Sequence, residues 1–127
     1  MKGRILYIED NEQNLYLVTF ILKASDHEVF QARSGLEGIA LALEGRPDLI
    51  LLDIQLPEMD GYEIARRLRG EPDLDGIPIV ALTSYAMVGD REKALEAGCD
   101  GYIEKPINPE IFLDQIEAFL PGQPSQR

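Results

Sequence analysis

The chain has 127 residues, which is enough for one domain with a hydrophobic core. Its formal net charge of −11 disfavours a nucleic-acid-binding surface, which normally needs clustered Lys and Arg side chains. A single cysteine, Cys99, excludes an internal disulfide and a cysteine metal cluster, and a single histidine, His27, excludes a histidine-rich metal site.

Short apolar runs alternate with helical segments along the chain. In chain order we expect strand 4–9, helix 11–24, strand 27–32, helix 34–45, strand 48–53, helix 61–69, strand 77–83, helix 90–97, strand 100–104 and helix 109–120. Asn11 can cap the first helix, and Gly45 followed by Pro47 ends the second. Such alternation is typical of a parallel sheet covered by helices on both faces. We therefore expect one α/β domain over residues 1–120, followed by a flexible polar tail over residues 121–127.

The third of these strands is central to the chain. Residues 49–52 are four consecutive apolar residues that end on Asp53, and such a run is typical of a strand buried on both faces. Pro57 and Gly61 end the regular structure shortly afterwards. Asp53 thus lies at the carboxyl end of a buried strand, which is the edge where open α/β sheets bind their ligands.

Polar residues end four of the five expected strands. They are Glu9 and Asp10 after the first strand, Asp53 at the end of the third, Thr83 and Ser84 at the fourth, and Lys105 after the fifth. The carboxyl ends of parallel strands lie along one edge of a sheet. In the flavodoxin-like strand order 2-1-3-4-5, the first and third strands are neighbours, which would bring Asp10 and Asp53 together.

Three converging carboxylates repel one another unless a cation or a proton intervenes. A hard divalent cation with oxygen ligands, such as Mg²⁺, suits this set. Carboxylates can form acyl phosphates, and phosphoryl transfer depends mainly on positioning and charge neutralisation. The residues therefore favour phosphoryl acceptance by Asp53; the alternative is an acidic sheet edge with incidental charges.

These segments resemble the receiver domains of bacterial two-component response regulators, in particular stand-alone ones similar to the chemotaxis and cell-division receivers. The resemblance covers about residues 4–120. It rests on five motifs: Ile8-Glu9-Asp10-Asn11, Pro47 to Asp53, Leu56 to Gly61, Ala81-Leu82-Thr83-Ser84 and Gly101 to Pro106. It implies a flavodoxin-like, doubly wound (βα)5 fold with a five-stranded parallel sheet in the order 2-1-3-4-5.

The resemblance also implies a role for each matched residue. Asp53 would be the phosphoacceptor. Asp10, Asp53 and the backbone carbonyl of Gln55 would bind Mg²⁺ (or Mn²⁺) directly, and Glu9 would reach the metal mostly through water. Lys105 would pair first with the carboxylate and then with the phosphoryl group.

The same resemblance assigns the surroundings of the phosphoryl group. The Thr83 hydroxyl and the backbone amides of Gln55 and Ser84 would bind its oxygens. Tyr102 would be the switch aromatic that moves inward as Thr83 shifts; the alternative is an ordinary half-buried strand aromatic. The Lys105-Pro106 bond would be cis, which is affordable for a bond preceding proline.

The function implied is a phosphoacceptor switch in a two-component system or phosphorelay. A histidine kinase or a histidine phosphotransfer protein would supply the phosphoryl group, and a downstream protein would read the switch. We expect no nucleic-acid partner and no dedicated turnover activity. We find neither an export signal nor an apolar run long enough to span a bilayer, so we expect a cytoplasmic protein without membrane association.

Other function classes stay open at this point. Aspartate-nucleophile phosphatases typically carry a second aspartate two residues after the nucleophile, where this chain has Gln55. A flavin-binding electron carrier needs a phosphate-binding loop after the first strand, where this chain is acidic. A structural adaptor would leave the acidic, lysine and threonine set unexplained. A receiver cut from a hybrid kinase is a further alternative.

Two features are more individual. Gln55 and Tyr85 would flank the phosphoryl group, and a bulky Tyr85 could shield it and slow self-dephosphorylation, unless its side chain points to solvent. In the first helix Leu17, Phe20 and Ile21 point largely away from the face formed by the core positions, and Tyr16 lies at the side. They form either a docking patch for a helical partner or contacts inside the fold.

Overall fold

The sheet and its covering helices are arranged as the resemblance implied. The computed structural model describes residues 3–56, 59–84 and 89–120. Within them, five parallel strands form one sheet in the order β2-β1-β3-β4-β5. The strands are β1 (Arg4–Ile8), β2 (Glu28–Ala32), β3 (Leu49–Asp53), β4 (Ile79–Thr83) and β5 (Gly101–Glu104). The helices are α1 (Glu12–Ala24), α2 (Gly35–Gly45), α3 (Gly61–Arg69), the short 3-10 helix η1 (Pro72–Leu74), α4 (Asp90–Glu96) and α5 (Pro109–Glu117). The flavodoxin-like, doubly wound (βα)5 prediction is confirmed.

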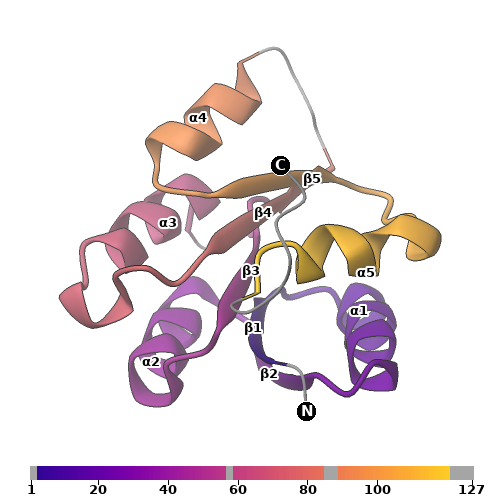
Figure 1. Ribbon diagram of the computed structural model, residues 1–127. Coiled ribbons are helices and arrows are strands. Elements are labelled where there is room, and N and C mark those ends of the chain that lie inside the picture. The colour runs from indigo at the N-terminus through magenta and orange to yellow at the C-terminus, as the bar shows by residue number, and fades with distance from the viewer. Residues whose placement is uncertain (1–2, 57–58, 85–88, 121–127) are drawn as a thin grey trace.

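Helices cover both faces of the sheet. Figure 1 shows α1 and α5 on one side and α2, α3 and α4 on the other. Successive residues of β3 point to opposite faces, so Ile50 and Leu52 pack toward α2 and α3, while Leu49 and Leu51 pack toward α1 and α5. All four side chains are fully buried. This double burial is the physical reason for the continuous apolar run in the sequence.

Side-chain caps begin the first two helices where the sequence predicts. The Asn11 side chain accepts a hydrogen bond of 2.9 Å from the Asn14 backbone amide at the start of α1. The Ser34 hydroxyl accepts one of 3.2 Å from the Glu37 amide at the start of α2. Each cap bonds to a backbone amide that has no partner within the helix, and so stabilises the start of the helix.

The loop after β3 returns close to its own starting point. The Gly61 amide donates to the Ile54 carbonyl at 3.2 Å, and a Cβ at Gly61 would lie 2.4 Å from the Ile54 Cα. Only glycine permits this approach without displacing the backbone. The approach fixes the path of the chain directly after Asp53.

Two predicted boundaries differ from the structure by two residues or more. β4 begins two residues later than predicted, because the Ile77 amide bonds to the Leu74 carbonyl in a turn and Pro78 has no amide to donate. α5 ends at Glu117 instead of residue 120, since the Phe119 and Leu120 amides bond three residues back in a tighter turn. The predicted flexible tail over residues 121–127 lies outside the described residues.

None of the helices in the described part of the chain is both long and apolar enough to cross a membrane.

Candidate functional site

Three carboxylates meet at the carboxyl ends of β1 and β3. These strands are paired with Ile8 opposite Leu52, so Glu9 and Asp53 leave the sheet side by side. One carboxylate oxygen each from Glu9, Asp10 and Asp53 lies within 4.8 Å of the others. Glu9 and Asp53 are buried, whereas Asp10 is exposed and opens the cluster to solvent. Oxygen ligands at this spacing, with access for water on one side, suit a hard divalent cation.

Lys105 brings one positive charge to this cluster. Its Nζ lies 3.2 Å from Glu9 Oε1 and 3.4 Å from Asp53 Oδ2. The residue follows β5, where its amide donates to the Thr83 carbonyl at 2.7 Å, and the Lys105-Pro106 bond is cis as the resemblance implied. One ammonium cannot neutralise three carboxylates, so the cluster retains capacity for a further cation.

The pKa values of the two buried carboxyl groups are shifted in opposite directions. Burial raises the pKa of Asp53 to about 6, and the hydrogen bond with Glu9 adds to this, while the Gln55 amide and Lys105 act against it. For Glu9, burial also acts upward, but hydrogen bonds from Asp53, Lys105 and Tyr7 and the charge of Lys105 outweigh it and lower the pKa. Asp53 is therefore the carboxyl group of this pair that protonates first as the pH falls.

The predicted phosphoryl-binding residues converge beside Asp53. The Gln55 backbone amide donates to Asp53 Oδ1 at 3.0 Å. Gln55 Nε2 donates to the Thr83 hydroxyl oxygen at 2.5 Å, and the Ser84 amide donates to Gln55 Oε1 at 2.9 Å. A side-chain amide thus connects the ends of β3 and β4 directly next to the acidic cluster.

Tyr102 lies on β5, next to β4. Its ring is half-buried, and its hydroxyl is buried without a hydrogen-bond partner among the described residues. Burial raises the pKa of this hydroxyl, as do Asp90 and Glu104, whereas Thr83 acts in the opposite direction. The hydroxyl therefore lies near the Thr83 side chain.

Tyr7 belongs to the site although the sequence interpretation missed it. Its hydroxyl donates to Glu9 Oε1 at 2.9 Å, and the side chain is fully buried beneath the cluster. Burial, followed by the charges of Glu9 and Asp53, raises the pKa of this hydroxyl far above its ordinary value, so it stays a donor. Tyr7 lies on β1 and Glu9 directly follows this strand, so their side chains share a face. This spacing of two residues could have indicated the contact from the sequence.

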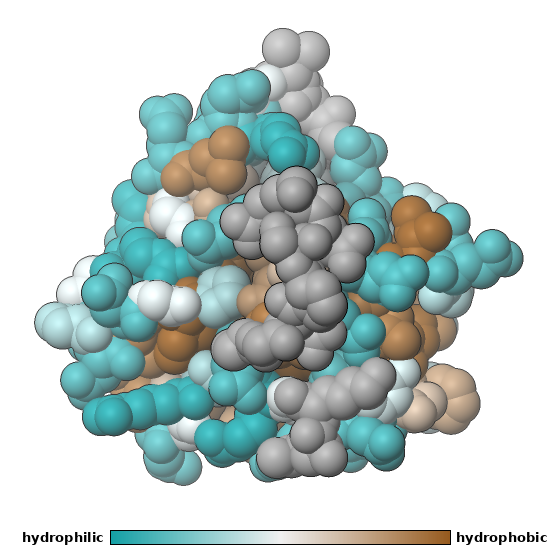
Figure 2. Space-filling model, in the orientation of Figure 1, coloured by the Kyte–Doolittle hydropathy of each residue, from teal (hydrophilic) through white to brown (hydrophobic). Residues whose placement is uncertain are grey.

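Two further predictions concern Tyr85 and the apolar residues of α1 that lie off its core face. Tyr85 lies outside the described residues, as do Pro57 and Glu58 of one motif. On α1, Tyr16 and Phe20 are 75% and 63% exposed and stack with their ring centroids 6.4 Å apart. Leu17 is also exposed, and Figure 2 shows apolar surface on the side of α1 and α5. Tyr16, Leu17 and Phe20 are thus not internal packing contacts, whereas Ile21, which the sequence placed with them, is partly buried against the core.

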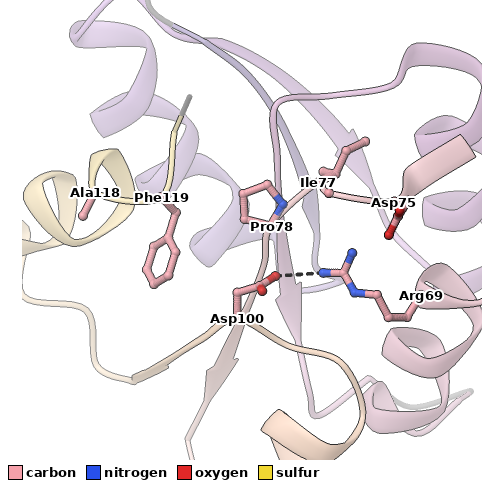
Figure 3. Close-up of a pocket in the computed structure, with 8 residues that line it drawn as sticks. Arg69, Asp75, Ile77, Pro78, Asp100, Ala118 and Phe119 are labelled. Carbon is pink, nitrogen blue, oxygen red and sulfur yellow. Dashed lines mark hydrogen bonds and ion pairs between the residues drawn. The ribbon is translucent and has the colours of Figure 1, made fainter. Parts of the chain in front are cut away.

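A separate cavity lies at the amino-terminal ends of β4 and β5, away from the acidic cluster. It has a volume of about 770 Å³ and is lined among others by Ile77, Pro78 and Phe119 (Figure 3). Arg69 and Asp100 form an ion pair of 2.8 Å across it, and Asp100 Oδ2 also accepts the Ile79 amide at 2.9 Å. The charges here are engaged in anchoring the starts of β4 and β5. Thr83 and Lys105, the candidate functional residues of these strands, lie at their carboxyl ends instead.

Comparison with known proteins agrees with this site. The response regulator receiver domain family matches residues 5–117. The polar-differentiation response regulator DivK of Brucella anthropi is 43% identical over 120 residues, which cover 94% of this chain and 98% of that protein. The chemotaxis protein CheY4 of Vibrio cholerae has a TM-score of 0.89 at 28% identity, covering 94% of this chain and all (100%) of that one.

A third relative carries a metal. The receiver domain of the sensor histidine kinase PA1611 from Pseudomonas aeruginosa PAO1, solved with a magnesium ion coordinated in its active site cleft, has a TM-score of 0.85 at 33% identity. The match covers 97% of this chain and 100% of that receiver domain. From the family match, these relatives and the shared fold, the chain belongs to the response regulator receiver domain family of two-component signalling.

Proposed function

We propose that this chain is a Mg²⁺-dependent phosphoacceptor switch in which Asp53 receives a phosphoryl group from a phosphohistidine. The observation that carries the proposal is the position of Asp53, a buried carboxyl group between two further carboxylates and an ammonium. Burying charged groups costs folding free energy, so a cluster of them is rarely kept without a function. A carboxyl group with a raised pKa beside a specific charge partner is typical of a functional site.

In the transfer step an oxygen of the Asp53 carboxylate attacks the phosphorus of the phosphohistidine. The new O–P bond forms as the P–N bond breaks, and the bonding electron pair returns to the imidazole nitrogen. Lys105 neutralises charge on the acceptor and then on the phosphoryl group. The Thr83 hydroxyl and the amides of Gln55 and Ser84 are the donors for its oxygens.

The donor set fits a magnesium ion. Glu9, Asp10 and Asp53 offer converging oxygens, and Asp10 leaves the cluster open to water. With the backbone carbonyl of Gln55, these residues would hold Mg²⁺ or Mn²⁺. A bound cation would offset the repulsion among the three carboxylates and would neutralise charge on the phosphoryl oxygens.

The partners we propose are a histidine kinase or histidine phosphotransfer protein as the donor and a downstream protein as the reader. Phosphorylation adds charge at the site and shifts an existing equilibrium between two conformations, with Tyr102 as the switch aromatic beside Thr83. We propose residues 1–120 as the receiver domain, and the cytoplasm as its location. The product is a modified form of the protein itself, so we do not class it as a dedicated enzyme.

The test is intact-mass spectrometry after incubation with acetyl phosphate and Mg²⁺. We expect one added phosphoryl group, which is absent without Mg²⁺ and in Asp53→Asn. The matched control is Asp75→Asn, which makes the same chemical change at an exposed loop position and should be phosphorylated like the unmodified protein. Phosphorylation that persists in Asp53→Asn would exclude Asp53 as the acceptor. Catalytic turnover of a small phosphate ester would instead indicate a phosphatase.

A further inference from the structure

The side chain of Gln55 bonds to two of the groups that are proposed to bind the phosphoryl oxygens. Gln55 Nε2 lies 2.5 Å from the Thr83 hydroxyl oxygen, and Gln55 Oε1 lies 2.9 Å from the Ser84 amide nitrogen. A backbone amide can only donate, so the atom beside Ser84 N must be the carbonyl oxygen Oε1. This fixes the orientation of the side-chain amide and makes Nε2 the donor to Thr83.

This bridge spans two strands. Gln55 lies two residues beyond the end of β3, whereas Thr83 is the last residue of β4 and is buried. The backbone amide of Gln55 is engaged separately, with Asp53 Oδ1 at 3.0 Å. The side chain is therefore an additional connection, which holds the end of β4 in a fixed position relative to the acceptor carboxylate.

The bridge and a phosphoryl group compete for the Ser84 amide. This amide has one hydrogen, so it cannot bond fully to Gln55 Oε1 and to a phosphoryl oxygen at once. The Thr83 hydroxyl can accept from Nε2 and still donate its own hydrogen, so the bond from Nε2 holds the side-chain amide in place and does not itself compete with the phosphoryl group. An anionic phosphoryl oxygen is a stronger acceptor than a neutral amide, so it can displace Oε1 from Ser84 once it is bound.

We propose that the carbonyl oxygen of the Gln55 side chain is an internal substitute for a phosphoryl oxygen, which occupies the Ser84 amide in the unphosphorylated state and must leave it when Asp53 is phosphorylated. This inference rests on the proposed function. It makes Gln55 a positioning residue that opposes phosphorylation, in addition to the backbone roles proposed for it above. The opposite arrangement, in which the amide stays and donates to the phosphoryl oxygens, predicts the opposite kinetic sign.

The test compares Gln55→Met and Gln55→Ala with the unmodified protein. Methionine retains the length of the side chain without its hydrogen-bonding groups, and alanine removes the side chain. We expect the rate constant for phosphorylation by acetyl phosphate with Mg²⁺, and the affinity for beryllium fluoride, to rise about three- to tenfold, the size expected for losing one competing hydrogen bond. We also expect faster hydrogen exchange of the Ser84 amide in the variants without phosphate.

Gln31→Met is the matched control. Gln31 Nε2 donates to the Thr19 hydroxyl at 2.9 Å between β2 and α1, a bond of the same chemical type at an exposed position away from the site. This variant should leave the phosphorylation rate unchanged.

Each other outcome decides against the inference in a recognisable way. Slower phosphorylation in both Gln55 variants would make the amide a helpful donor, and rates within twofold of the unmodified protein would show that no competition exists. Faster phosphorylation without faster Ser84 exchange would assign the effect to something other than this bridge. If the unmodified protein itself neither gains a phosphoryl group nor binds beryllium fluoride, the proposed function fails, and the inference fails with it.

Discussion

At the scale of single residues, the Tyr7 hydroxyl has a measurable role. Replacing Tyr7 by Phe removes only this group, which donates to the buried carboxylate of Glu9. Losing a hydrogen bond to a buried charged group destabilises a protein by about 1–3 kcal/mol, because the charge loses a donor that water cannot replace. We expect Tyr7→Phe to lower the free energy of unfolding by this amount in urea denaturation. Tyr16→Phe, at an exposed ring, is the control and should change it by less than about 0.5 kcal/mol.

The raised pKa of Asp53 predicts a pH-dependent effect of Asp53→Asn. The folded pKa of about 6 exceeds the ordinary value of 3.8, so between these pH values the folded state binds more protons than the unfolded state. By linkage, this group makes the protein less stable as the pH rises through that window, and the full loss is present above it. Asn cannot ionise, so we expect Asp53→Asn to raise the free energy of unfolding at pH 7 by about 1–3 kcal/mol without divalent cations.

The comparison of two pH values tests this sign. Below about pH 4, Asp53 is protonated in both states, so the variant should lose its advantage there. Urea denaturation of both proteins at pH 4 and pH 7 measures the difference. A variant that is less stable than the unmodified protein at pH 7 would show that the ion pair with Lys105 outweighs the cost of burying the Asp53 charge.

At the scale of elements, α1 presents an apolar surface that the fold leaves uncovered. Phe20 is 63% exposed and stacks on Tyr16, whereas Leu15, Val18 and Leu22 face the core. If this face binds the phosphoryl donor, Phe20→Ala should slow transfer from a histidine phosphotransfer partner by about tenfold or more, as interface aromatics often do when truncated. Phosphorylation by acetyl phosphate, which needs no docking surface, should be unchanged.

The matched control for this element is Leu95→Ala on α4, another exposed apolar residue. Equal rates of partner transfer for Phe20→Ala and the unmodified protein would remove α1 as the docking surface.

His27 illustrates a different kind of contact between elements. It is buried and its Nε2 lies 2.9 Å from Glu117 Oε2, so it connects the start of β2 with the end of α5.

At the scale of the whole molecule, cation binding and folding are linked. The acidic cluster forms only when β1 and β3 pair, because Glu9, Asp10 and Asp53 come from distant parts of the chain. A cation that binds only the folded state stabilises it by about 1.4 kcal/mol at tenfold its dissociation constant. We expect Mg²⁺ to raise the melting temperature measured by calorimetry, and Asp10→Asn to reduce this rise. An unchanged melting temperature at saturating Mg²⁺ would contradict the metal site.

The sequence by itself determined the fold class and placed Glu9, Asp10, Asp53, Thr83 and Lys105 at the carboxyl ends of the expected strands. Apolar runs of strand length, alternating with capped helices, dictate a parallel sheet, and parallel strands must bring their carboxyl ends to one edge. The motifs around Glu9, Asp53, Thr83 and Lys105 lie at those ends, so their convergence followed from the topology. The strand order itself came from the family resemblance, because periodicity does not distinguish one order from another.

Only the tertiary structure decided how these side chains bond to one another. The bond from the Tyr7 hydroxyl to Glu9, the raised pKa of Asp53 and the Gln55 bridge to Thr83 and Ser84 all depend on side-chain directions and on burial. The exposure of one face of α1 was likewise open until its neighbours were placed. The physical reason is that a local pattern specifies which face a residue occupies, whereas its partners come from segments that are distant in sequence and adjacent only in the folded chain.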